Sequence, residues 1–147
     1  ILHPRSVGRV SLANGDPRNA PLWDPNILSD PHDLMVARAA IRKTRAIFAQ
    51  PAFDALRGPE LGPGDGLQID NEIDAYIRET AMPDIHSVGT CRMGNDAMAV
   101  TDAQLRVQGI EGLRIVDASI MPRVPSGNTN VPTMMIGEKA SALILNA

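Results

Sequence analysis

Apolar residues recur at helical spacing in three stretches of the chain, residues 33–50, 70–80 and 132–146. Such spacing places the apolar side chains along one face of a helix, which can then pack on a core. Asp33 is expected to cap the first helix. Pro132 fits the first turn of the last helix, because its missing N–H would have no partner there. The pattern therefore predicts three helices that are apolar on one face.

Two other stretches have patterns typical of strands. Residues 5–12 alternate between apolar and polar positions, which predicts a strand with no evident partner nearby. Residues 15–31 contain three Asp-Pro pairs and are expected to form a long irregular connection. The apolar run at residues 113–116 ends at Asp117, as a buried parallel strand does where it reaches a ligand-binding edge.

Composition narrows the possible partners. The net charge is −3, so no basic surface for nucleic acid is indicated. No apolar run is long enough to span a membrane, and the first residues do not resemble a signal peptide. The single cysteine excludes a disulfide within the chain and a multi-cysteine zinc site. We expect no bound metal, no transmembrane segment and a cytoplasmic location.

The chain contains few large rings for its length. Aromatic residues make up 3% of the 147 residues, while glycine and proline number 12 each. A self-contained domain of this size usually packs more aromatic side chains. This composition favours a part of a larger protein over an independent domain.

Residues 86–94 combine a histidine with a turn. His86 opens the run His-Ser-Val-Gly-Thr-Cys-Arg-Met-Gly, and Pro83 and Gly89 bracket a rigid loop around it. A neutral imidazole can accept a proton near neutral pH, which makes His86 a candidate general base. The alternative is a structural histidine whose hydrogen bonds are satisfied within the fold.

Two asparagines precede the last predicted helix. Asn130 either caps that helix, as asparagine commonly does, or joins Asn128 in directing amide donors into a cavity. A helix N-terminus there would stabilise negative charge on a bound group. Asp117 either accepts hydrogen bonds from a cofactor hydroxyl or caps the turn that follows it. Neither this segment nor the histidine segment has the residues of a metal site or the glycine spacing of a phosphate loop.

Four runs of the chain resemble, in order, the C-terminal region of the glucose-methanol-choline (GMC) flavoprotein oxidoreductases. The similarity is to the choline dehydrogenase and alcohol dehydrogenase branch. Residues 4–10 and 24–26 look like the segment where the substrate domain of the family resumes its antiparallel sheet. The four runs are residues 86–94, 100–109, 112–122 and 127–139.

The resemblance implies an α+β fold in two parts. Residues 1–80 would end the substrate-binding domain of the family. Residues 81–147 would return to the FAD-binding domain and supply a strand and the C-terminal helix. That helix would direct its positive N-terminal end at the flavin of FAD.

The resemblance also implies a reaction, the oxidation of a primary alcohol to an aldehyde with hydride transfer to N5 of FAD. His86 matches the histidine that takes the hydroxyl proton. Asn128 matches the second active-site position, where its amide would hydrogen-bond the substrate oxygen, because an amide does not titrate. The positions that match the surroundings of FAD, mostly through backbone groups, are Ile85, Asp117, Ala118, Thr129 and Asn130.

One family feature is missing from the chain. The G-x-G-x-x-G fingerprint for the ADP part of FAD, which lies in the N-terminal half of the family, does not occur here. We therefore expect a C-terminal fragment whose partner is the missing N-terminal FAD-binding part, and which is inactive alone. Two alternatives are a cyanohydrin (hydroxynitrile) lyase on the same scaffold and a non-catalytic interaction module.

Overall fold

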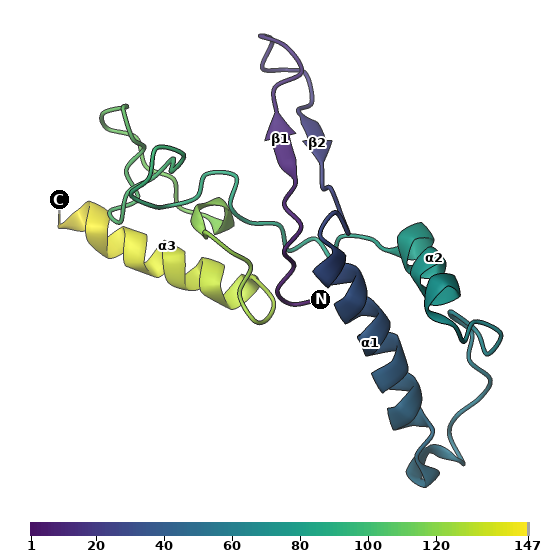
Figure 1. Cartoon of the computed structure of the whole chain (residues 1–147). Coiled ribbons are helices and arrows are strands. Elements are labelled where there is room, and N and C mark those ends of the chain that lie inside the picture. The colour runs from purple at the N-terminus through teal and green to yellow at the C-terminus, as the bar shows by residue number, and fades with distance from the viewer. Residues whose placement is uncertain (147) are drawn as a thin grey trace. The chain divides into compact units, whose positions relative to one another are not determined.

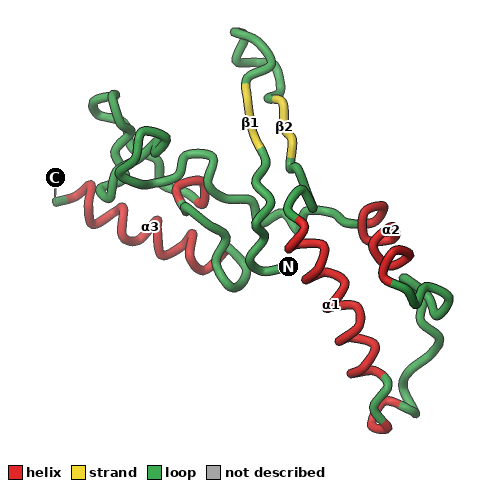
Figure 2. Tube along the Cα trace, in the orientation of Figure 1, coloured by secondary structure: helices red, strands yellow, loops and turns green. Residues whose placement is uncertain are grey.

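The computed structural model describes residues 1–146 of the chain. Within them lie the helices α1 (Pro31–Phe48), α2 (Asp70–Thr80) and α3 (Asn130–Leu145) (Figure 1). The other elements are the strands β1 (Arg9–Ser11) and β2 (Leu22–Asp24) and the 3-10 turns η1 (Pro51–Phe53) and η2 (Ala118–Ile120) (Figure 2). The mixture of helices with antiparallel strands agrees with the predicted α+β class.

The chain divides into two compact units. The first contains residues 1, 3–8 and 25–82, and the second contains residues 2, 9–24 and those from 83 onward. Each unit has its own cluster of buried apolar side chains. Among residues 1–146, no helix is both long enough and apolar enough to cross a membrane.

The three predicted helices are confirmed, with α2 beginning and ending as expected. In α1 the predicted cap is wrong, because Asp30 and not Asp33 is the N-cap. The Asp30 carboxylate accepts a hydrogen bond of 2.8 Å from the backbone N–H of His32. Pro31 follows as the first helical residue, so the helix begins two residues before Asp33.

Asp33 fastens the N-terminal segment of the chain to α1. Its side chain is 1% exposed and accepts hydrogen bonds of 2.8 Å from the backbone N–H groups of Arg5 and Ser6. The Ser6 hydroxyl donates a third at 2.5 Å. Burial alone would raise the pKa of Asp33, but the hydrogen bonds from Ser6 and Arg5 outweigh it and hold the pKa below its usual value.

α1 and α2 lie side by side in the first unit (Figure 1). Their buried contact is formed by Leu34 of α1 and by Ile73 and Ile77 of α2, with Leu28 beside them. Ion pairs add to it, because Arg38 of α1 forms an ion pair with Asp74 of α2 at 2.9 Å and another with Asp70. Arg38 therefore supports the packing of α1 against α2.

The second unit contains an antiparallel hairpin that the sequence did not predict. β1 confirms the expected strand, but its partner β2 lies within the stretch expected to be irregular. Val10 of β1 faces Trp23 of β2, and all residues of both strands are exposed. Three residues of strand give too short a pattern to detect, and the pairing arises from contacts across the hairpin.

The core of the second unit joins η2 to α3. Ile120 of η2 and Ile136 and Ala140 of α3 are buried together with Leu105 and Met121. These side chains come from segments far apart in the sequence. The core therefore fixes the position of α3 relative to residues 118–121.

The predicted buried strand at residues 113–116 is wrong for this structure. Arg114 makes a single antiparallel bridge with Arg106, and Leu113 is exposed. A buried parallel strand needs neighbouring strands and cover on both faces. The described residues supply neither to this segment.

We expect Asp33→Asn to lower the free energy of unfolding by about 2 kcal/mol, because Arg5 and Ser6 lose hydrogen bonds to a buried, charged acceptor. Urea unfolding of the protein measures this, with Asp65→Asn, an exposed carboxylate of the same unit, as the control. Equal effects of the two substitutions would contradict the role of Asp33.

The contribution of Asp33 should also depend on pH. Because its pKa is lowered in the folded state, the contribution is complete above the unfolded value of about 3.9 and is lost as the pH falls below it. The stability difference between the native protein and Asp33→Asn should therefore narrow below about pH 4. A difference that stays constant down to pH 2 would argue against this assignment.

Candidate active site

His86 lies in the loop between α2 and η2, where it is half-buried. Its Nδ1 atom is 3.0 Å from the hydroxyl oxygen of Thr129. The two residues are 43 positions apart in the sequence. This contact brings the histidine segment to the segment that contains Asn128, Thr129 and Asn130.

Two residues in the loop around His86 have positive φ angles. Ile85, just before His86, has a φ of 54° and is 91% exposed. Gly89 has a φ of 88°, and a Cβ atom at this position would lie 3.3 Å from the carbonyl oxygen of Met121. Glycine is favoured there, because another residue would be strained at this φ and its Cβ atom would be crowded by the Met121 carbonyl.

Backbone hydrogen bonds connect the same loop to η2. The N–H of Cys91 donates to the carbonyl of Ser119 at 3.0 Å, and the N–H of Met93 donates to that of Ile120 at 2.8 Å. Since Ile120 is part of the core with α3, the loop, η2 and α3 form one connected arrangement. Both partners of the His86–Thr129 contact are therefore attached to η2, the loop of His86 by backbone hydrogen bonds and α3 by the core.

The N-terminus of α3 differs from the capping expectation for Asn130. Thr129 is the N-cap, and Asn130 is the first helical residue, so the capping interpretation of Asn130 is wrong. Asn128 and Asn130 are both exposed. The first turn of α3 carries no acidic residue, so no carboxylate in that turn neutralises the positive end of the helix dipole.

For Asp117 the capping interpretation agrees with the structure. Its carboxylate accepts a hydrogen bond of 2.7 Å from the N–H of Ser119 and caps η2. Ala118 is the first residue of η2 and is half-buried. All the predicted site residues thus lie in the second unit, and the Asp117–Ala118 pair connects to α3 through Ile120.

The sequence did not predict the hydroxyl of Thr129 as the partner of His86. Thr129 was expected near the cofactor, mostly through its backbone. One local signal could have indicated this contact. Thr129 carries a hydroxyl just before the helix, and the third helical residue, Pro132, has no N–H that this hydroxyl could cap.

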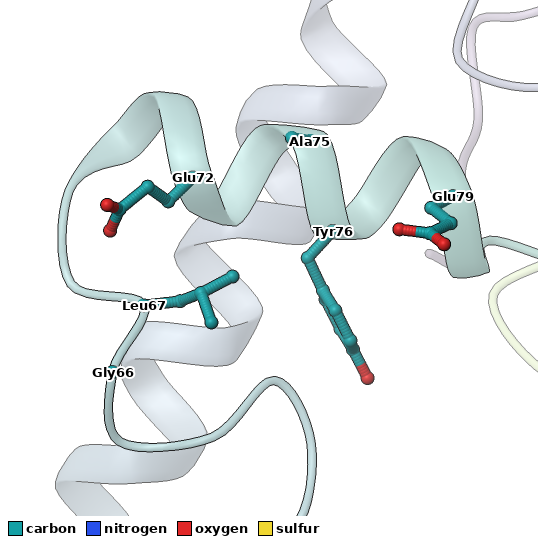
Figure 3. Close-up of a pocket in the computed structure, with 6 residues that line it drawn as sticks. All are labelled: Gly66, Leu67, Glu72, Ala75, Tyr76 and Glu79. Atoms are coloured by element: carbon teal, nitrogen blue, oxygen red, sulfur yellow. The ribbon is translucent and has the colours of Figure 1, made fainter.

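A shallow cavity lies elsewhere, on α2 of the first unit (Figure 3). Tyr76 and the carboxylates of Glu72 and Glu79 project from one side of the helix, beside Leu67. None of the predicted site residues lines this cavity. Within residues 1–146, no group of three or more His, Cys, Asp or Glu side chains is arranged to hold a metal ion.

Sequence and structure comparisons both find similarity to oxidoreductases of one family. Residues 4–137 match the family model described as GMC oxidoreductase. The chain is 49% identical over 143 residues to an oxygen-dependent choline dehydrogenase of Rhizobium etli, covering 96% of this chain and 26% of that protein. It is 49% identical over 138 residues to the corresponding protein of Chromohalobacter salexigens, covering 94% of this chain and 25% of that one.

Solved structures agree. Pyridoxine 4-oxidase from Mesorbium loti superposes with a TM-score of 0.93 at 32% identity, over 99% of this chain and 28% of that one. A fungal aryl-alcohol oxidase superposes with a TM-score of 0.90 at 32% identity, over 99% of this chain and 24% of that one. The chain therefore spans about a quarter of the length of the curated relatives that it matches.

We expect Gly89→Ala to destabilise the loop that carries His86 by about 1–2 kcal/mol, because the new side chain is strained at positive φ and presses on the Met121 carbonyl. Thermal unfolding of the protein measures this. Gly15→Ala is the matched control, since a Cβ atom there would meet nothing within 4 Å. If both variants melt together, the loop does not need its glycine.

Proposed function

The chain belongs to the GMC oxidoreductase family, and we propose that it is the C-terminal part of an FAD-dependent enzyme that oxidises a primary alcohol to an aldehyde. The family match confirms the resemblance found in the sequence, and the TM-scores confirm the α+β fold. The observation that carries the proposal is the contact between His86 and Thr129, because it brings the candidate base to the segment of Asn128. The similar proteins are dehydrogenases and oxidases, which supports a redox reaction.

The proposed domain assignment gives residues 1–80 to the substrate-binding domain and residues 81–147 to the FAD-binding domain. The division between the two compact units, which falls between Met82 and Pro83, supports it. The hairpin of residues 9–24 is the exception, since it groups with the second unit.

In the proposed reaction His86 takes the proton of the substrate hydroxyl. Its Nδ1 atom is engaged by Thr129, so Nε2 is the atom left for the substrate. Asn128, an exposed residue directly before Thr129 in the chain, donates an amide hydrogen bond to the substrate oxygen. A base and a donor acting on one oxygen hold the alcohol and remove its proton in a single orientation.

The N-terminus of α3 fits the predicted cofactor. With no acid in its first turn, the helix presents a positive end that favours an electron-rich ring. The residues proposed to surround the cofactor are exposed or half-buried, except for Thr129. When bound, FAD supplies the two-electron acceptor of the reaction, and one of the similar solved structures is an FAD-dependent oxidoreductase from Chaetomium thermophilum. The residues proposed to hold it are Ile85, Asp117, Ala118, Thr129 and Asn130.

The proposed partner of the chain is the N-terminal FAD-binding part of the same protein. α3 is apolar on more than one face, with Met134 67% and Leu145 83% exposed. Helices that are apolar all round are normally buried, and an isolated two-stranded hairpin is marginally stable. Both α3 and the hairpin therefore need cover from another part of the protein. A cytoplasmic location belongs to the same proposal and rests on the single cysteine.

In the full-length protein, His86→Ala should lower kcat/KM for a primary alcohol by about 10²–10⁴-fold, because a general base contributes that much. The flavin should be reduced by the alcohol without oxygen, and correspondingly more slowly in the variant. His32→Ala, a half-buried histidine of the first unit, is the control.

Three results would contradict this proposal. A loss of less than about tenfold in kcat/KM for His86→Ala would show that His86 is not the general base. Cleavage of a cyanohydrin without flavin reduction would favour the lyase. A full-length protein that holds no flavin and turns over no alcohol would favour the interaction module.

The 147-residue chain alone should not bind FAD tightly, because it lacks the dinucleotide fingerprint for the ADP part of the cofactor. Mixing the chain with FAD and removing free FAD by gel filtration tests this. A stoichiometric flavin spectrum on the eluted chain would overturn the expectation.

A further inference from the structure

We propose that Thr129 is a positioning residue for His86, whose hydroxyl accepts the Nδ1–H and keeps Nε2 unprotonated toward the substrate. The proposal rests on the proposed role of His86 as the base. It deepens that role, because it assigns the side chain of Thr129 a task separate from the cofactor contacts of its backbone. The observation behind it is the 3.0 Å contact between Nδ1 and Oγ1.

The hydroxyl of Thr129 is available because of its place in α3. A threonine at the N-cap usually accepts a hydrogen bond from the N–H of the second or third helical residue. Here the third residue is Pro132, which has no N–H. Thr129 also has helical backbone angles, φ −75° and ψ −11°, and its side chain makes no capping hydrogen bond. The hydroxyl therefore bonds His86 instead of the helix.

Thr129 is held rigidly enough to act as a fixed point. It is 9% exposed, and its carbonyl accepts hydrogen bonds from Thr133, 3.0 Å from the N–H and 2.7 Å from the hydroxyl. A β-branched side chain also has few allowed rotamers. The helix behind it is anchored in the core by Ile136 and Ala140. The orientation of the His86 ring thus follows from the packing of α3.

The direction of this hydrogen bond decides whether His86 can act as a base. Neutral imidazole has one N–H, so an Nδ1–H that donates to Thr129 leaves the lone pair on Nε2. The hydroxyl proton of the alcohol can then move to Nε2. In the resulting imidazolium the Nδ1–H still donates to Thr129, now as a charge-assisted hydrogen bond. If the Thr129 hydroxyl donated instead, the proton would be on Nε2 and would block the reaction.

The first test observes the proton on the wild-type enzyme. In the full-length, FAD-loaded protein labelled with ¹⁵N at histidine, His86→Ala identifies the signals of His86. We expect the signal typical of N–H at Nδ1 and that of an unprotonated nitrogen at Nε2 when the ring is neutral. A neutral ring with its proton on Nε2 would overturn the proposal without any Thr129 variant.

The second test removes the hydroxyl. Thr129→Val should lower kcat about tenfold with little change in KM, because one hydrogen bond that orients the base is lost while substrate contacts remain. Thr129→Ser, which keeps the hydroxyl, should recover most of this loss. Thr101→Val is the matched control, since Thr101 is fully buried in the same unit and its hydroxyl donates to the carbonyl of Cys91.

The outcomes separate this proposal from the one on which it rests. If His86→Ala is severely impaired while Thr129→Val matches Thr101→Val in kcat and keeps the tautomer, Thr129 does not position the base, and His86 still is one. If His86→Ala retains full activity, the proposed function of His86 fails. If Thr129→Ser is as impaired as Thr129→Val, the hydroxyl is not the group that matters, and the proposal is wrong.

Discussion

The hydrogen bond between His86 and Thr129 joins two segments that are 43 residues apart, and the candidate site depends on it. It can form only because α3 is fixed against η2 by Ile120 and Ile136, while backbone hydrogen bonds from Cys91 and Met93 tie the histidine loop to the same turn. The core packing, the loop hydrogen bonds and the N-cap of α3 together determine the position of the His86 ring. A change in any of them is expected to move the ring relative to Thr129.

The exposed surfaces of the same structure support the proposal that this chain supplies only part of an active site. The second unit brings His86 to the N-cap of α3, whose first turn carries no acid, yet much of α3 and both strands of the hairpin remain exposed. Apolar helix faces and open strand edges of this kind are covered in stable proteins. The chain also spans about a quarter of its relatives, 26% of the protein from Rhizobium etli. In our proposal the catalytic side chains lie in this chain, and the rest of the protein encloses the cofactor.

The sequence predicted what local patterns determine. The three helices follow from apolar spacing, and α2 has the bounds that the pattern indicated. Errors arose where distant contacts decide, as at Asp33, which binds Arg5 and Ser6 instead of capping α1, and at β2, which is a strand because of its pairing with β1. The role of the Thr129 side chain was missed for the same reason. Resemblance to a family can indicate that His86 matters, but the contact that orients it is visible only in three dimensions.

A structure of the full-length protein with FAD and an unreactive analogue of a primary alcohol tests the central claim most directly. Our account predicts that Nε2 of His86 and the amide of Asn128 both lie about 3 Å from the oxygen of the analogue, within hydrogen-bond range. The Nδ1 atom of His86 should remain on the hydroxyl of Thr129. Side chains of His86 and Asn128 that lie more than roughly 10 Å apart, or that face away from the analogue, would contradict it.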